Sequence, residues 1–348
     1  MSCVRTIAAH AARGLGLLVV LVATVAIGAE RKEAAPVSLA PLPEAVSSFG
    51  GAIVGDWLYV YSGHTGEAHA HSKKNLSQKF QRLSLVKGAA WEQLPAGPGL
   101  QGLPMVGYGN NVYRIGGLSA LNEPGEKEKL VSITEFAAFD PAQGKWSQLA
   151  TLPEGRSSHD AAVLGDTLYV VGGWNLGSER GWHKSALSID LKDPKATWKE
   201  LPAPPFQRRA LAVAAHQGRI YAIGGMTPEG PSNDVDYFDV SKQTWHKGPV
   251  LSGKPMMGFG SSAFELGGKL YATTMDGTIN RLSDDGKEWQ SAGKLQEARF
   301  FHRMIPYGNA MIIVAGASHG VGHLDSIERF TPEASSPAKA TEQAGGQP

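Results

Sequence analysis

A motif repeated along most of the chain constrains the fold more than any other feature. Each copy joins an apolar strand through a turn to a second strand that ends in two small residues, and the copies span residues 55–63, 109–117, 165–173, 217–225, 267–274 and 308–316. Five of the units close with a tryptophan, at Trp91, Trp146, Trp198, Trp245 and Trp289. Units of about 50 residues with four strands each are typical of a β-propeller. We therefore predict an all-β fold with six blades.

The repeats place the blades at about 45–95, 97–153, 156–204, 207–250, 255–296 and 298–332. The last unit lacks its tryptophan and is followed by a low-complexity tail, residues 333–348, which we expect to be disordered. Residues 37–43 (VSLAPLP) resemble the end of other repeats, such as residues 146–153 (WSQLATLP). A strand from this N-terminal segment would complete the last blade, closing the ring and removing its open sheet edges.

The double glycine, the spaced aromatic residue and the arginine ahead of the first strand resemble the Kelch repeat. The resemblance covers residues 37–332 and implies a six-bladed Kelch propeller. It is specific for the fold and not for the activity, because proteins with unrelated functions share this scaffold. The copies are unequal: Thr273-Thr274 and Ala315-Gly316 replace the glycine pair in the last two repeats.

The first 29 residues have the pattern of a secretory signal peptide. Arg5 and Arg13 precede an apolar run over residues 14–29 that ends in small residues. We expect export to the periplasm or the extracellular space, with no membrane insertion after cleavage. An uncleaved anchor formed by residues 14–29 is the alternative, since this run is only slightly short of a membrane span.

The net charge gives no reason to expect a nucleic-acid partner. The chain has 33 Lys and Arg residues against 32 Asp and Glu residues, a formal charge of +1. Any binding must therefore come from local sites. The loops that follow the double-small positions are longest in blades 1 to 3, and we place function on the face that carries them.

Three arginines stand at the same position of their repeats: Arg156, Arg208 and Arg299. His159 and His302 each follow such an arginine by three residues. The Kelch resemblance puts these positions at the mouth of the central channel, where arginines bind anionic ligands in some members, and a guanidinium group suits a carboxylate. In the alternative interpretation, each arginine bonds loop carbonyls between blades.

Histidines gather on the same face. His64, His69 and His71 belong to blade 1, and His319 and His323 belong to blade 6, its neighbour once the ring closes. Neutral imidazoles suit zinc or copper. The spacing matches no standard metal motif, so solvated loop histidines with no cofactor are the alternative.

Trp174 and Trp182 lie in a long loop of blade 3 on this face. Exposed aromatic side chains could form a stacking platform for a sugar or a partner protein. They could equally fold back to cover blade 3.

These features favour a binding module that recognises a carbohydrate or a protein ligand through its loops and channel-mouth arginines. The alternative is a sugar mutarotase or epimerase similar to the exported sialic acid enzymes of Kelch type. In those enzymes a catalytic Glu follows the glycine pair of blade 4 and an Arg stands six residues further on; here these positions are Met226 and Ser232, and Glu229 is the candidate substitute. Whether the protein is an enzyme stays open, but galactose oxidase chemistry is excluded because the sole cysteine, Cys3, lies in the signal.

Overall fold

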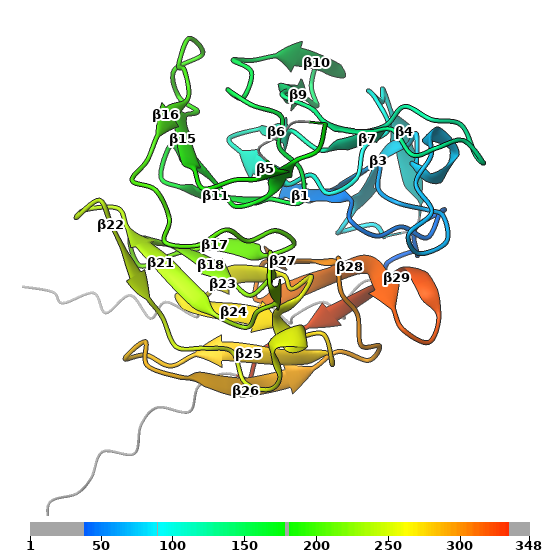
Figure 1. Cartoon of the computed structure of the whole chain (residues 1–348). Coiled ribbons are helices and arrows are strands. Elements are labelled where there is room, and N and C mark those ends of the chain that lie inside the picture. Colours follow the sequence, from blue (N-terminus) through cyan, green and yellow to red (C-terminus); the bar gives the residue numbers. More distant parts are fainter. Residues whose placement is uncertain (1–37, 89, 178–180, 334–348) are drawn as a thin grey trace, which may run out of the picture. The chain divides into compact units, whose positions relative to one another are not determined.

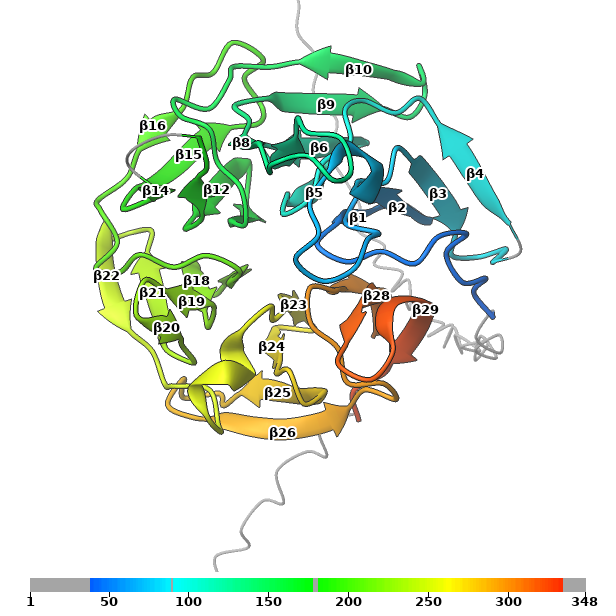
Figure 2. The ribbon, with the colours of Figure 1, turned by 45° about the vertical axis from the view of Figure 1, so that its right-hand side comes forward.

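The computed structural model describes residues 38–88, 90–177 and 181–333 (Figure 1). These residues form six antiparallel sheets arranged around a central axis, as Figure 2 shows. The all-β, six-bladed propeller predicted from the repeats is confirmed. The predicted signal peptide and nearly all of the predicted disordered tail lie outside the described residues.

Blades 1 to 3 each contain four strands. Blade 1 consists of β1 (Gly50–Val54), β2 (Trp57–Tyr61), β3 (Phe80–Ser84) and β4 (Trp91–Leu94). Blade 2 consists of β5 (Met105–Tyr108), β6 (Asn111–Ile115), β9 (Phe136–Asp140) and β10 (Lys145–Gln148). Blade 3 consists of β11 (Asp160–Leu164), β12 (Thr167–Val171), β15 (Ala186–Asp190) and β16 (Lys199–Glu200). In each sheet, the hydrogen-bonded order of the strands follows the chain.

Blades 4 and 5 repeat this pattern, and blade 6 has three strands among the described residues. Blade 4 consists of β17 (Ala212–His216), β18 (Arg219–Ile223), β21 (Val235–Asp239) and β22 (Thr244–Lys247). Blade 5 consists of β23 (Ala263–Leu266), β24 (Lys269–Thr273), β25 (Thr278–Leu282) and β26 (Trp289–Lys294). Blade 6 consists of β27 (Arg303–Tyr307), β28 (Ala310–Ser318) and β29 (Gly322–Phe330). The first strands of neighbouring blades contact one another, so they line the channel.

Short additional elements decorate one face, which we call the loop face because it carries both the loops between second and third strands and the links between blades. Three hairpins lie there: β7 (Leu118–Ala120) with β8 (Leu130–Ser132), β13 (Trp174–Asn175) with β14 (Gly181–Trp182), and β19 (Met226–Thr227) with β20 (Gly230–Pro231). Two 3-10 turns also belong to the connections on this face: η1 (Lys73–Asn75) lies between β2 and β3, and η2 (Pro255–Gly258) lies between β22 and β23. Within the described residues, no helix has the length and apolar character needed to cross a membrane.

In blades 1 to 5, a tryptophan at the outer strand contacts the segment that follows the preceding outer strand or, in blade 1, the N-terminal segment. Its indole N–H donates to a backbone carbonyl just after the preceding outer strand, as in Trp146 to Pro95 (2.8 Å), Trp245 to Pro202 (2.7 Å) and Trp289 to Pro249 (2.8 Å). An indole whose ring packs between sheets needs such an acceptor for its N–H. This double requirement explains why tryptophan recurs at this position.

The same contact appears where the two ends of the propeller meet. Trp91 of blade 1 donates to the Pro41 carbonyl (2.8 Å), and the Leu42 N–H donates to the Asp325 carbonyl of β29 (2.8 Å). The segment over residues 38–43 thus lies beside the last blade, although it forms no regular strand there. The closing strand over residues 37–43 stays a prediction, and the Trp91 contact supports it.

Gly116, the first glycine of its pair, shows why small residues end the second strand. It has φ +54°, and an added Cβ would lie 2.4 Å from the Arg156 carbonyl oxygen of the next blade. Gly109 has a similar φ of +58° with open space around the same position. We predict that Gly109→Ala lowers the free energy of unfolding by about 1–2 kcal/mol through backbone strain. Gly116→Ala should lower the free energy of unfolding by about 1–3 kcal/mol more than Gly109→Ala does, because the added methyl group overlaps blade 3.

Urea unfolding of the two variants beside the unsubstituted protein measures this difference. Equal losses for Gly116→Ala and Gly109→Ala would show that the glycine pair serves the backbone conformation alone.

Candidate binding site at the channel mouth

Six backbone hydrogen bonds form a closed ring around the loop-face end of the channel. One residue in the link before each first strand donates its N–H to the carbonyl of its counterpart one blade back; these residues are Ser48, Gly102, Ser158, Ala210, Gly260 and Phe301. Their N···O distances are 2.6–3.0 Å, and all six have φ between +50° and +66°. The bond from Ser48 to Phe301 joins the first blade directly to the last.

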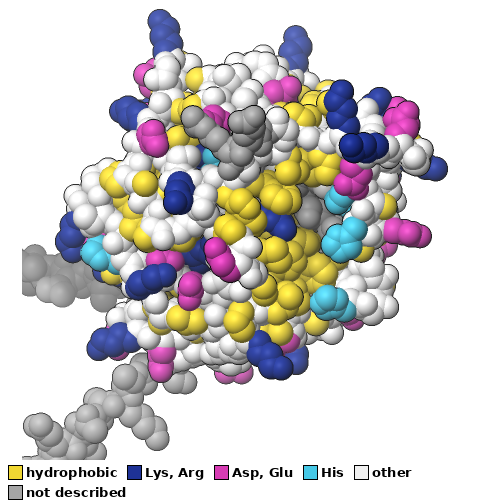
Figure 3. All heavy atoms as spheres, viewed as in Figure 1, with side chains coloured by type: hydrophobic (Ala, Val, Ile, Leu, Met, Phe, Trp, Pro, Cys, Tyr) yellow, Lys and Arg dark blue, Asp and Glu magenta, His cyan; other side chains and the backbone are white. Residues whose placement is uncertain are grey.

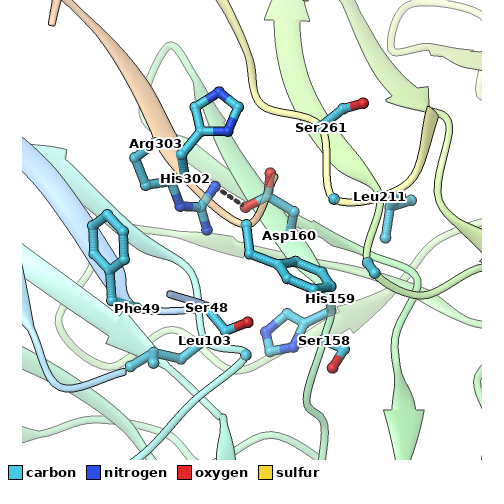
Figure 4. Close-up of a pocket in the computed structure, with 14 residues that line it drawn as sticks. Ser48, Phe49, Leu103, Ser158, His159, Asp160, Leu211, Ser261, His302 and Arg303 are labelled. Atoms are coloured by element: carbon cyan, nitrogen blue, oxygen red, sulfur yellow. Dashed lines mark hydrogen bonds and ion pairs between the residues drawn. The ribbon is translucent and has the colours of Figure 1, made fainter. Parts of the chain in front are cut away.

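A cavity of about 60 Å³ lies within this ring (Figure 4). Its charged and imidazole side chains are His159, Asp160, His302 and Arg303. Since one water needs roughly 10–15 Å³ of such space, the cavity holds a few waters or one small polar substituent. A whole sugar ring or a peptide side chain of normal size must stay outside it.

Arg303 and Asp160 meet inside the channel. The guanidinium Nη1 of Arg303 is 2.8 Å from Asp160 Oδ1, and the second carboxylate oxygen accepts the Val213 N–H at 2.9 Å. Their side chains are 12% and 5% exposed. The two residues occupy equivalent positions in blades 6 and 3, which lie opposite each other in a six-bladed ring. The ion pair, drawn as a dashed line in Figure 4, therefore spans the channel at the base of the cavity.

The two cavity histidines are buried and neutral. Burial, reinforced by Arg156, holds the pKa of His159 well below its usual range, and burial with help from Arg299 and Arg303 lowers the pKa of His302 to about 3. His302 Nε2 lies 3.1 Å from Thr273 Oγ1. Among the described residues, neither ring nitrogen of His159 has a hydrogen-bond partner. Both nitrogens are closed to solvent, and the residue packs against Gly116 and Gly173 at the ends of two second strands, so His159 lines the cavity without offering it a hydrogen-bonding nitrogen.

The three repeat arginines do not line this cavity. Each is 1% exposed and bonds carbonyls of its own blade, namely Gly172 and Ser185 for Arg156, Gly224 and Asp234 for Arg208, and Ala315 and Ser326 for Arg299. Arg208 also pairs with Asp236 and Arg299 with Glu328. Burial lowers the pKa of Arg156 to about 10 and shifts that of the other two in the same direction. These contacts favour the structural alternative, and ligand binding by these arginines stays a prediction.

Trp174 and Trp182 form an aromatic platform with Arg209. The two indole rings pair across the β13–β14 hairpin with centroids 6.0 Å apart. The Arg209 guanidinium carbon lies 4.1 Å from the Trp174 ring and 5.6 Å from the Trp182 ring. Trp174 pairs through its backbone with Ser157, and Arg209 immediately precedes Ala210 of the hydrogen-bonded ring. Trp174, Trp182 and Arg209 are each half-buried. The stacking platform and the cover over blade 3 therefore both stay predictions.

The histidines of blades 1 and 6 meet as predicted, but without the geometry of a metal centre. His64 Nδ1 lies 3.2 Å from His323 Nε2, and His64 Nε2 donates to the Ala70 carbonyl at 2.9 Å. His71 packs beside them, with its ring centroid 5.3 Å from that of His64. Burial lowers the pKa of His64 to about 4. The described ranges contain no group of three or more histidine, cysteine or carboxylate side chains placed to hold a metal ion.

The remaining candidates lie apart from the cavity. His69 is exposed, and His319 Nε2 approaches the Met275 sulfur at 3.3 Å. Glu229 is exposed at the tip of the β19–β20 hairpin, where its own N–H donates to Thr227 Oγ1. Met226, at the position of the enzymes' glutamate, contacts Arg209 Nη2 through its sulfur at 3.2 Å.

The sequence patterns did not predict three residues of the site: Asp160, Arg303 and Arg209. A signal for two of them was present, because Asp160 and Arg303 directly follow the paired histidines of repeats 3 and 6 and carry opposite charges. Opposite charges at equivalent positions of opposite blades can meet across the channel. No comparable pattern marks Arg209, whose role depends on the fold of the neighbouring hairpin.

The blade architecture, the glycine pairs and the hydrogen-bonded mouth define a Kelch-type propeller. The model of the "KLHDC2/KLHL20/DRC7 Kelch-repeats domain" matches residues 102–285, and the chain belongs to this family. A solved structure described as "Structure of YjhT" superposes with a TM-score of 0.70 at 18% identity, covering 85% of this chain and 98% of the other. At that identity, the likeness concerns the fold alone.

Sequence relatives cover different extents of the chain. N-acetylneuraminate epimerase of Haemophilus influenzae (strain PittEE) is 33% identical over 126 residues, which are 34% of this chain and 31% of the enzyme. The F-box/kelch-repeat protein At1g80440 of Arabidopsis thaliana is 28% identical over 263 residues, 71% of this chain and 70% of that protein. The match to the epimerase thus spans about a third of the length of either protein.

A comparison of the neighbouring residues Arg208 and Arg209 tests the structural role of Arg208. Arg208→Met removes the buried partner of the fully buried Asp236 carboxylate and leaves it only the exposed Lys247 at 3.2 Å, and we expect a loss of about 3–5 kcal/mol in the free energy of unfolding. Arg209→Met removes a half-buried cation stacked on indole rings, for which we expect a loss of about 1 kcal/mol. Urea unfolding of both variants is the measurement. An Arg208→Met protein as stable as the unsubstituted one would return Arg208 to the list of ligand-binding candidates.

Proposed function

We propose that this protein is an exported Kelch-propeller binding module that recognises a carbohydrate or a protein segment on its loop face. The observation that carries the proposal is the Trp174–Arg209–Trp182 platform beside the polar cavity. Indole rings pack well against the C–H face of a sugar or an apolar peptide side chain. Figure 3 shows hydrophobic side chains gathered in a patch on the molecular surface, with histidine side chains beside it.

Platform and cavity supply complementary contacts for one ligand. The Nε of Arg209 has no acceptor within the described part of the chain, and burial lowers the pKa of this arginine. This Nε is closed to solvent, so a ligand oxygen would satisfy the donor only after a shift of the Arg209 side chain. A hydroxyl substituent entering the cavity would meet the Arg303–Asp160 ion pair, which lines it. The ligand body then stays on the platform, because the cavity accepts only a small group.

The platform predicts the effect of removing one indole. Trp174→Ala should weaken binding to the ligand at least tenfold, since both the aromatic surface and the arginine stack are lost. Screening on a glycan array and a peptide array, followed by titration calorimetry with the best ligand of the unsubstituted protein, measures the change. Trp57→Ala is a matched control, because Trp57 holds a similar stack with Arg82 at 4.1 Å, at the start of β2 on the opposite face. Equal affinities for the two variants would refute the proposed site.

A sugar mutarotase or epimerase is the second candidate function, favoured by the identity to N-acetylneuraminate epimerase. Glu229 is the candidate catalytic residue. If the protein is such an enzyme, it accelerates anomer exchange of N-acetylneuraminate, and Glu229→Gln abolishes the acceleration. Exchange measured by NMR at the uncatalysed rate with the unsubstituted protein would leave the binding module as the only candidate.

Export is the remaining part of the proposal. It is supported by the basic residues Arg5 and Arg13 ahead of the apolar run 14–29. The mass of the protein recovered outside the cytoplasm tests it, since cleavage after the run shortens the chain by about 29 residues.

A further inference from the structure

The channel contains a second chamber that the mouth does not reach. Its lining begins one residue beyond Asp160 on β11 and two residues beyond Arg303 on β27, so the Arg303–Asp160 ion pair separates it from the cavity at the loop face. All six first strands contribute to its wall, through Ala52, Val106, Ala162, Val213, Phe264 and Ile305 among others. The chamber measures about 280 Å³. This is close to the lower end of the roughly 300–1,000 Å³ typical of small-molecule sites.

A single charged residue stands in this otherwise apolar wall. Among the described residues, Glu265, on the channel strand β23 of blade 5, is the only one lining the chamber with an ionisable side chain. Its Oε2 lies 2.6 Å from Nδ1 of His216, which is 6% exposed, while the Glu265 side chain is 39% exposed. The carboxylate is thus oriented by a buried imidazole and still open to solvent. A carboxylate accepts up to about four hydrogen bonds, which leaves room for a ligand.

The cations on neighbouring turns are engaged elsewhere. Lys269 pairs with Asp284 at 2.5 Å, and the Arg219 guanidinium lies over the Tyr237 ring at 4.6 Å. An apolar chamber with an acidic rim is complementary to a molecule with an aliphatic body and a cationic head. Anionic amphiphiles of the same size would meet like charge at the rim.

We propose that this chamber is a second ligand site, which binds a small primary alkylammonium with its chain in the channel and its ammonium group on Glu265. The site is independent of the loop-face platform, because the ion pair lies between them. It requires neither an enzymatic activity nor the ligand of the proposed function.

Titration calorimetry with hexylammonium chloride tests the proposal on the full chain. We expect saturable binding of hexylammonium and none of hexanoate at the same concentration. Glu265→Gln should weaken hexylammonium binding at least tenfold. Glu288→Gln, which neutralises an exposed carboxylate of the same blade outside the channel, should leave the affinity unchanged.

A second variant keeps the test decisive if Glu265→Gln disturbs folding, which its melting temperature reveals. Ala215→Leu narrows the chamber next to His216 and retains Glu265, and it should also weaken hexylammonium binding. Absence of binding by the unsubstituted protein, equal binding of hexanoate, or unchanged affinity in Ala215→Leu would overturn the proposal. Trp174→Ala should bind hexylammonium normally, which separates this result from the outcome for the loop face.

Discussion

The ring of six backbone hydrogen bonds at the channel mouth is the constraint on which the rest of the structure depends. Each bond requires a left-handed backbone at one residue per blade, and four of the six are not glycine. A left-handed conformation costs about 1–2 kcal/mol at such residues, roughly what one net hydrogen bond contributes. The ring is therefore maintained by the closed propeller around it. Strained backbone of this kind is concentrated at functional sites, and here it surrounds the mouth cavity.

The ring also decides what the channel can do. It brings the first strands together at the loop face, where Arg303 and Asp160 meet across the axis. Their ion pair divides the channel into a polar cavity of about 60 Å³ and an apolar chamber of about 280 Å³. Recognition at the loop face must consequently rest on the surface around the mouth. The platform of Trp174, Arg209 and Trp182 offers such a surface. The backbone of Arg209 is fixed by its pairing with Met226 and by the ring bond of the next residue, Ala210, to Ser158.

Candidate residues chosen from the repeat differ in how well their roles could be predicted. That histidines of blades 1 and 6 would lie on neighbouring blades followed from ring closure, but that His64 meets His323 did not. The repeat pattern also identified Arg156, Arg208 and Arg299. It did not predict which way their side chains point. A guanidinium in this position either points to the mouth or turns into its own blade, and the carbonyls that capture it become available only when the loops fold. The sequence likewise could not predict whether the histidines are free to bind a metal. In the folded loops, ring nitrogens of His64 and His323 bond backbone carbonyls.

The sequence by itself determined the six blades, their order and the residues that join them, because each of these features depends on local spacing that repeats. Tryptophan at the outer strand and glycine at the end of the second strand satisfy requirements within one unit and its neighbour. Only the tertiary structure decided which polar groups remain available. Asp160 and Arg303 are 143 residues apart, and their pairing depends on ring closure. The same closure buries the repeat arginines and separates Glu265 from the mouth, because burial and partner choice are properties of the assembled ring.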